Sequence, residues 1–408
     1  MMNANKKTPK LRFKGFTDDW EQRKLDDIAK IKTGGGTPKT ANPEYWSGNI
    51  PWIQSSDLVE GDIVHVNINK FINNNALKNS AAKLISRDSI VLVTRVGVGK
   101  VAVINQEFTT SQDFLSLSDF DGSDIKFLAY QLYRLMQENA KVLQGTSIKG
   151  ITKTELIEQS ISIPSSGQEQ NLISNVLSKI DSIITLHQRK IEKLKLNKSA
   201  LLQKMFPQNR CAVPEVRFKG FAEDWEQRKL SDVLVERNEQ EVETREYPLM
   251  SFVQGLGVVP KGERYDRSFL VLDQSKKYKR TELGDFIYSS NNLETGSIGI
   301  NKTGKAVISP VYSIFQGVSI GDSQFIGIMS LLPKFIAKMI RFRQGVVYGQ
   351  WRIHETDFLD ISVLIPSVDE RTKITQLILS IEEIIILHQR KLDRLMSIKK
   401  ALLQQLFV

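Results

Sequence analysis

The sequence contains the same set of segments twice. The segment PKLRFKGFTDDWEQRKLDDI at positions 9–28 returns at 214–233 as PEVRFKGFAEDWEQRKLSDV, with 14 of 20 positions identical. A second pair of similar segments ends at Phe206 and at Phe407, so the copies are offset by 201 to 205 residues. Solenoid repeats run to only about 20 to 50 residues, so this period indicates a duplicated domain.

The interiors of the two copies, roughly 30–150 and 235–350, share little visible similarity. In the first, β-rich runs at Ser89–Thr94 and Lys100–Ile104 precede a helical pattern at Ile125–Val142, which predicts a mixed α/β domain. The second interior predicts the same class, with strands at Asp285–Ser289, Lys305–Ser309 and Val311–Gln316 and one helix at Phe325–Arg343.

A heptad pattern of apolar residues closes each copy. Its seam carries a polar pair at the same two positions, His187 and Lys198 in the first copy and His388 and Lys399 in the second. A helix of about 35 residues is roughly 50 Å long, which is typical of a coiled coil. Because a duplicated chain can arrange its copies about a pseudo-twofold axis, we expect these two helices to pair antiparallel.

The expected fold is therefore of the α+β class. Two mixed α/β domains are separated by two long antiparallel coiled-coil helices, and the chain has an internal pseudo-twofold repeat. The predicted segments are a first domain at 1–160, a first helical spacer at 161–210, a second domain at 211–362 and a second helical spacer at 363–408.

Composition narrows the class of protein. Hydrophobic residues make up 41% and charged residues 25% of the 408, which are ordinary globular values. The net charge of +10 favours a polyanionic partner. One cysteine, Cys211, excludes an intramolecular disulfide and a multi-cysteine zinc site. No apolar run reaches the roughly 18 residues that span a bilayer, and the N-terminus lacks the apolar core of a signal peptide. We therefore expect a cytoplasmic protein that does not bind a membrane.

Two segments resemble catalytic motifs without completing them. Gly299–Ala306 nearly matches a nucleotide-binding P-loop, but Ala306 stands where a hydroxyl must bind Mg²⁺, so we interpret it as a turn entering a strand. Asn42-Pro43-Glu44-Tyr45 resembles an adenine methyltransferase signature, but Glu44 replaces the second proline, so we interpret it as a turn. The four histidines form no metal-binding pair at a spacing of four residues. These observations predict a chain without catalytic residues.

The repeated border does not stand alone. It occurs with Gly-Gly-Thr-Pro at 35–38, Ile-Pro-Trp at 50–52, and Ile-Pro-Ser turns that lead to Leu-His-Gln-Arg-Lys and Ala-Leu-Leu-Gln. Together these motifs, which cover essentially the whole chain, resemble the specificity subunit of type I restriction-modification systems.

This resemblance implies two target-recognition domains, each reading one half of a bipartite site on double-stranded DNA, with the helices setting the unread gap. It implies two methyltransferase subunits that carry S-adenosylmethionine and modify adenine N6. It also implies restriction subunits that use ATP and Mg²⁺, so this chain itself would hold no cofactor. The alternative is an orphan DNA-binding or scaffold protein of the same duplicated fold that serves methylation alone.

Candidate DNA contacts lie at strand ends and in loops that carry paired donors and acceptors for base edges, or donors for phosphates. In the first domain they are Thr37, Arg95, Lys100, Gln112, Thr146, Ser147 and Lys149. In the second they are Asn291, Asn292, Tyr348, Gln350 and Arg352. Trp351 has two interpretations, stacking on DNA or filling a core. The run Gly34–Pro38 is either a backbone that approaches a phosphate or a flexible loop. Because the interiors differ in sequence, we expect no contact to map from one domain to the other.

Candidate partner contacts lie on the helices. A pair of partners related by a twofold axis requires a surface that is presented twice, and a charged triplet occurs identically in both helices. Its members are Gln188, Arg189, Lys190, Gln389, Arg390 and Lys391. The other interpretation is a solvated charged helix face.

Overall fold

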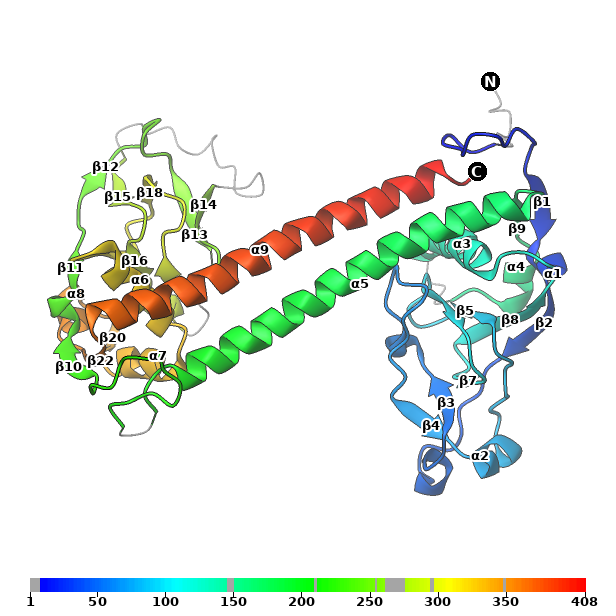
Figure 1. Ribbon diagram of the computed structural model, residues 1–408, viewed down its shortest axis with the longest axis horizontal. Helices are drawn as coiled ribbons and strands as arrows, with labels where there is room; N and C mark the ends of the chain where they lie inside the picture. The colour runs from blue at the N-terminus through cyan, green and yellow to red at the C-terminus, as the bar shows by residue number, and fades with distance from the viewer. Residues whose placement is uncertain are drawn as a thin grey trace. The chain divides into compact units, whose positions relative to one another are not determined.

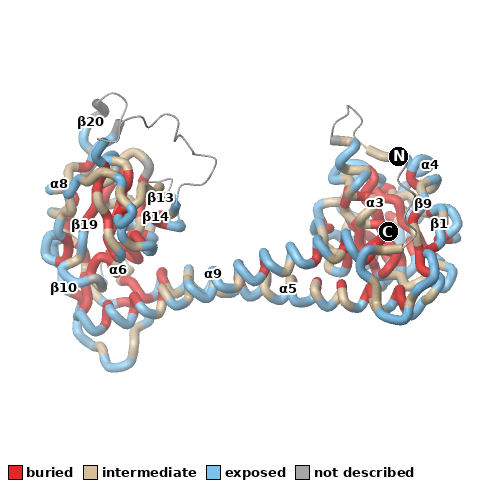
Figure 2. The backbone as a smooth tube through the Cα atoms, turned by 90° about the horizontal axis from the view of Figure 1, so that it is seen from above, coloured by how far each residue is buried: buried red, intermediate tan, exposed pale blue. Residues whose placement is uncertain are grey.

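The computed structural model of the chain describes residues 8–144, 150–208, 211–253, 255–260, 276–293, 297–347 and 350–408. The chain divides into two compact units, Met1–Arg189 with Gln389–Val408, and Lys190–His388. Each unit therefore consists of one mixed α/β domain together with the parts of the two long helices that belong to it (Figure 1). Buried residues gather inside each unit (Figure 2).

A four-stranded antiparallel sheet forms the centre of the first unit. Its order is β2 (Ala29–Gly34), β8 (Phe114–Phe120), β5 (Ser89–Val93) and β6 (Val101–Ile104). The helix α3 (Ile125–Gln144) packs against β5 and β6. The predicted strands and helix of the first interior are thus confirmed, because their apolar residues supply the buried core.

Smaller elements complete the first unit. A second sheet has the order β4-β3-β7, and three short helices lie elsewhere in the unit. These elements are β3 (Ile50–Ile53), β4 (Lys70–Ile72), β7 (Thr109–Thr110), α1 (Leu25–Ile28), α2 (Asn74–Asn79) and α4 (Lys153–Ile157).

The central sheet of the second unit has the same connectivity as that of the first. Its order is β11 (Leu234–Glu236), β19 (Ser313–Gly317), β16 (Phe286–Tyr288) and β17 (Ile298–Ile300). In both sheets the strand that comes first in the chain, β2 or β11, pairs with the strand that comes last, β8 or β19. That last strand also pairs with a central strand, β5 or β16, which pairs in turn with the next strand of the sheet, β6 or β17. Two interiors without visible sequence similarity therefore fold on one plan.

The second unit also contains short hairpins. Three further sets of strands pair as β12-β15-β18, β13-β14 and β20-β21. Their bounds are β12 (Gln240–Glu241), β13 (Met250–Val253), β14 (Gly257–Pro260), β15 (Tyr278–Thr281), β18 (Ala306–Ile308), β20 (Gln344–Val347) and β21 (Gln350–Arg352). The segment that resembles a P-loop is the turn between β17 and β18, as its interpretation from sequence predicts.

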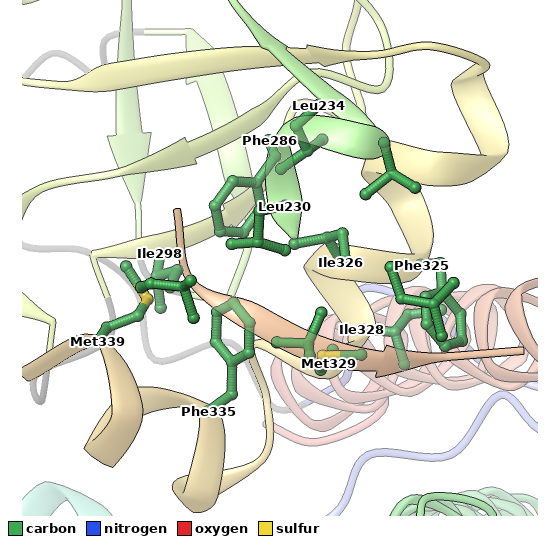
Figure 3. Close-up of a cluster of buried hydrophobic side chains, with 14 of the residues drawn as sticks. Leu230, Leu234, Phe286, Ile298, Phe325, Ile326, Ile328, Met329, Phe335 and Met339 are labelled. Carbon is green, nitrogen blue, oxygen red and sulfur yellow. The ribbon is translucent and has the colours of Figure 1, made fainter. Parts of the chain in front are cut away.

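The single helix predicted at Phe325–Arg343 is wrong. Two helices occupy this region, α6 (Ile320–Met329) and α7 (Pro333–Ile340), and they are bent by 91° at the break. Pro333 lacks a backbone N–H and restricts the residue before it, so the helix ends and a new one starts. Both helices still bury apolar side chains against the sheet, including Phe325 and Phe335 (Figure 3).

The two predicted long helices are present as α5 (Gly167–Lys204) and α9 (Val368–Gln405), each of 38 residues. At 1.5 Å per residue each is about 57 Å long. In the first unit, Ile173 and Leu177 near the start of α5 share a core with Leu403 near the end of α9. In the second unit the end of α5 packs with the start of α9. The segments in each unit are therefore antiparallel.

The repeated border docks onto the start of each long helix. Arg12 forms a bidentate ion pair with Glu169 at 2.7 and 2.9 Å, and Arg217 forms the same pair with Glu370 at 2.7 and 2.8 Å. Both glutamates are 1% exposed. The Glu-Gln-Arg-Lys motif then forms a strand that pairs with the strand before the helix: β1 (Glu21–Lys24) with β9 (Ser160–Ile163), and β10 (Glu226–Lys229) with β22 (Ser362–Ile365). The repeated border therefore makes the same ion pair and the same strand pairing in both units.

Candidate DNA interface

The first candidate site surrounds the end of the central strand β5. A cavity of about 520 Å³ is lined there by Thr94, Arg95, Gln112 and Lys153, among others. Thr94 holds this arrangement together because its carbonyl accepts from Ile151 N at 2.9 Å and its N–H donates to the carbonyl of Asp113 at 2.7 Å. The sheet thus brings together loops that lie far apart in the sequence.

Three of the predicted residues lie at this cavity or beside it. The hydroxyl of Thr37 donates to Gln112 Oε1 at 2.5 Å, which orients the exposed glutamine amide. Within the described part of the chain, the Gln112 amide nitrogen and the exposed Arg95 guanidinium have no hydrogen-bond partner. An amide and a guanidinium that keep free donors are the groups that read base edges.

Lys100 is occupied within the fold. Its ammonium donates to the carbonyls of Ser55 at 2.9 Å and Leu58 at 2.8 Å, and the residue is half-buried. Two of its three donors are therefore used to hold a loop against β6. We leave Lys100 out of the interface because its geometry favours a structural role.

The glycine run pairs with its own chain. A Cβ on Gly35 would lie 2.0 Å from the carbonyl oxygen of Ser111, and one on Gly36 would lie 2.0 Å from that of Ala81. Gly36 N also donates to the carbonyl of Thr110 at 2.9 Å. Both interpretations from sequence, a phosphate-approaching backbone and a flexible loop, therefore give way to close packing, which requires residues without a side chain.

The remaining predicted residues of the first domain, Thr146, Ser147 and Lys149, lie outside the described residues, as does Tyr348 of the second domain. The side chains of Asn292 and Gln350 are not described, although their backbones belong to a 3-10 turn and to β21.

The second candidate site surrounds the end of β16. Asn291 follows this strand in a 3-10 turn, and the preceding Ser290 accepts from Ile353 N at 3.0 Å. This bond places the turn next to the strand β21, which ends at Arg352. The Arg352 side chain is 66% exposed and lies 3.8 Å from Glu355.

Trp351 lies on the surface of this site. Its side chain is 45% exposed, and the guanidinium carbon of Arg343 is 5.9 Å from its ring centroid. The exposure contradicts the core-filling interpretation. A half-exposed indole beside an arginine offers a face on which a sugar or base can stack.

The two candidate sites occupy the same topological position. Each lies after the central strand of its sheet, and in each a backbone N–H two positions before a short helix donates to a residue just beyond that strand. Ile151 N donates to the Thr94 carbonyl before α4, and Ile353 N donates to the Ser290 hydroxyl before α8 (Glu355–Leu359). The two sites therefore correspond in strand order, while the expectation that no DNA contact maps from one domain to the other stays a prediction. Positions map through strand order even though side chains differ.

Sequence reasoning missed two residues of these sites. Lys153 lines the first cavity, and its ammonium donates to the Lys32 carbonyl at 3.1 Å. Arg343 lies beside Trp351. Lys153 lies four positions after the candidate Lys149, so a wider window would have included it. Arg343 was assigned to a helix that the structure ends earlier.

The described residues contain no group of three or more His, Cys, Asp or Glu placed to hold a metal ion. Among the same residues, no single helix has both the length and the apolar composition to cross a membrane, and α6 with α7 meets these criteria only as a bent pair.

The candidate partner residues lie on the outer surface of the long helices. Arg189, Lys190, Gln389, Arg390 and Lys391 are exposed and Gln188 is half-buried. Exposed apolar residues lie one turn before each triplet, Ile183 and Leu186 in α5 and Ile384 and Leu387 in α9. These pairs are offset by 201 residues, so the same apolar and basic surface is presented once by each helix.

The family model that describes the type I restriction modification DNA specificity domain matches residues 17–196. This stretch of the chain is similar to a type I DNA specificity domain. This match confirms the resemblance to type I specificity subunits. The specificity domain contains the whole of the first candidate site.

Two curated relatives of the specificity domain carry the same description. The type I restriction enzyme MjaIX specificity subunit of Methanocaldococcus jannaschii is 31% identical over 228 residues, 53% of this chain and 52% of that protein. The type I restriction enzyme EcoR124I/EcoR124II specificity subunit of Escherichia coli is 27% identical over 180 residues, 42% of this chain and 43% of that protein. The chain thus spans about half the length of the curated relatives it matches.

The fold has a solved counterpart over nearly the whole chain. The crystal structure of the type I restriction-modification system S subunit from M. genitalium superposes with a TM-score of 0.67 at 17% identity, covering 98% of this chain and 99% of that one. This likeness supports the mixed α/β fold with long helices.

Proposed function

We propose that this chain is the DNA sequence-specificity subunit of a type I restriction-modification complex, in which each mixed α/β domain reads one half of a bipartite site. One observation carries the proposal. The two units hold equivalent exposed surfaces at the end of their central strands, but these surfaces present different side chains, such as Arg95 with Gln112 and Arg352 with Trp351. Equivalent position with different chemistry suits two readers of two different half-sites.

The chemistry of each surface supports direct readout. Arg95 and Arg352 can each donate two hydrogen bonds to one guanine edge, and the Gln112 amide can pair with an adenine. Lys153 and Arg343 add positive charge for phosphates, which fix the position of a protein on DNA without selecting a sequence. The two long helices would then hold the unread gap between the half-sites.

The partner surface follows from the duplication. We propose that two methyltransferase subunits dock on the long helices, one over Ile183, Leu186 and the adjacent triplet, and one over the equivalent residues of α9. An exposed apolar pair beside basic residues has the composition of an interface centre with a charged rim. S-adenosylmethionine, ATP and Mg²⁺ would be bound by the methyltransferase and restriction subunits, and the complex would act in the cytoplasm with no catalytic residue on this chain.

The experiment is a map of N6-methyladenine in genomic DNA from cells that carry this chain with its methyltransferase, and from cells that lack this chain. We expect a bipartite motif that disappears with the chain. Replacing residues 30–150 by the interior of another specificity domain should change one half of the motif and leave the other intact. Methylation that is unchanged without the chain would refute the proposal.

A further inference from the structure

Two ion pairs join the long helices, one in each unit. In the first unit Asp181 of α5 pairs with Lys399 of α9, and both side chains are buried. In the second unit Lys198 of α5 pairs with Glu382 of α9 at 2.5 Å. Asp181 and Glu382 are 201 residues apart, as are Lys198 and Lys399, so the same two positions of the duplicated helix supply both pairs.

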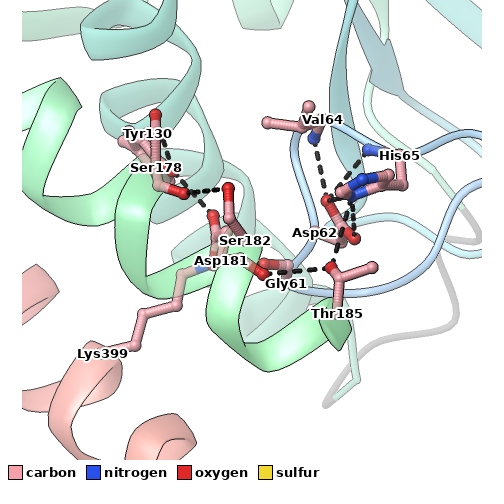
Figure 4. Close-up of polar contacts among 10 residues, drawn as sticks. All are labelled: Gly61, Asp62, Val64, His65, Tyr130, Ser178, Asp181, Ser182, Thr185 and Lys399. Atoms are coloured by element: carbon pink, nitrogen blue, oxygen red, sulfur yellow. Dashed lines mark hydrogen bonds and ion pairs between the residues drawn. The ribbon is translucent and has the colours of Figure 1, made fainter. Parts of the chain in front are cut away.

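In the first unit this pair also holds the mixed domain (Figure 4). The Lys399 ammonium donates to the carbonyl of Gly61, which lies in the domain, and it lies 5.5 Å from the ring centroid of Tyr130. The Tyr130 hydroxyl, from α3, donates to Asp181 at 2.7 Å. Two helices and the recognition domain therefore meet at one buried polar cluster.

In the second unit Glu382, like Asp181 in the first, accepts from a residue of the other helix and from a residue of the mixed domain. Glu382 accepts from Lys198 through one oxygen and from Lys302 through the other, each at 2.5 Å. Lys302 belongs to the turn between β17 and β18 that resembles a P-loop in sequence. This turn thus docks the second recognition domain onto the helices.

The electrostatics show how far these groups depend on one another. Burial raises the pKa of Asp181, and Lys399 opposes this effect only in part. Burial also acts to raise the pKa of Glu382, but Lys302 and Lys198 outweigh it and the net pKa lies below the ordinary value. In both junctions the lysine partners favour the charged form of the carboxylate, which burial disfavours.

The pairs discriminate between helix registers. A slip of one heptad, about 10 Å along the helix, would move Lys399 opposite a neutral residue and Glu382 opposite an apolar one. The residues that would face them are Ser174 or Gln188 for Lys399, and Ile191 or Met205 for Glu382. Because losing the partner of a buried or half-buried charge is costly, the two pairs oppose a slip of one heptad in either direction.

We propose that the two junctions, Asp181–Lys399 with Gly61 and Lys198–Glu382 with Lys302, are positioning sites that select the number of base pairs accepted between the two half-sites. The inference rests on the proposed function. One heptad corresponds to about three base pairs at 3.4 Å each.

The test uses the full chain with co-expressed methyltransferase subunits and duplexes that carry both half-sites at the native gap or at gaps changed by one to three base pairs. Variants are Lys302→Ala, Lys399→Met, and Asp181→Leu combined with Lys399→Leu. The control is Glu215→Gln, which breaks the exposed pair between Lys204 and Glu215. We expect the preference for the native gap to fall by about tenfold or more in the variants and to stay unchanged in the control, with both half-site sequences retained.

The paired leucine variant separates positioning from stability, since apolar replacement of a buried ion pair is often neutral for stability. An unchanged melting temperature with a broadened gap preference supports the inference. A folded leucine variant and a folded Lys302→Ala variant that both keep the wild-type gap preference overturn it and leave the proposed function intact. A wild-type complex that methylates no bipartite duplex refutes the proposed function itself.

Discussion

The last residues of the chain are predicted to stabilise the domain built from its first residues. Phe407 is 3% exposed in the first unit, where its ring stacks on Phe127 at 5.3 Å and meets Trp20 edge-on at 6.2 Å. Truncating a buried phenylalanine to alanine costs about 3–5 kcal/mol. For a unit of this size, Phe407→Ala should lower the unfolding midpoint by roughly 6–20 °C.

Hydrogen exchange followed by mass spectrometry locates the effect. Amides of β5 and β8 should exchange faster by about two to four orders of magnitude, while those of the second unit keep their rates. Phe206→Ala is the matched variant, because Phe206 packs on Trp225 and Phe325 in the second unit and should reverse the pattern. Faster exchange in the second unit from Phe407→Ala, or none in the first, would refute this packing.

Three further predictions test individual residues. Arg352→Ala should weaken DNA binding by about 1–3 kcal/mol and relax one base position in one half-site, and an unchanged methylation motif would contradict it. Lys100→Met should lower the stability of the first unit by about 1.5–3 kcal/mol in calorimetry, since it removes charge-assisted hydrogen bonds to the carbonyls of Ser55 and Leu58. It should leave DNA affinity unchanged, and weaker DNA binding at equal stability would argue against the structural role. Because the folded pKa of Glu382 lies below its ordinary 4.5, its charge contributes stability that is present above pH 4.5 and lost as pH falls through the folded value. Urea unfolding of Glu382→Gln across this range should lack that loss, and a slope equal to that of the wild type would oppose the assignment.

Features that depend on local periodicity were predictable from sequence. The heptad seam specified both long helices, and the repeated border specified that each would be entered in the same way. Strands such as β5 and β6 were predictable because runs of β-branched residues are buried on both faces. The family resemblance rests on the same repeated motifs, which the match at residues 17–196 confirms for the specificity domain.

The candidate sites were predictable in part. Arg95 and Gln112, which follow strands, and Arg352, which ends one, are all exposed, because side chains at strand ends lie near the surface. Their contact with DNA stays a prediction. The same reasoning included Lys100, whose long side chain reaches back to carbonyls more than 40 positions away in the chain. The local sequence pattern does not predict a contact over such a sequence separation.

Sequence alone determined that this protein is a duplicated chain with long helices and two divergent interiors. Only the tertiary structure decided that the interiors share one strand order, that Phe407 completes the first unit, and that the same acid and lysine positions pair across the two helices. The physical reason is distance along the chain. Helix and strand patterns depend on neighbours a few residues apart. Strand order, domain completion and helix register depend instead on contacts between residues that lie far apart in the chain, such as Trp20 and Phe407, which 387 positions separate.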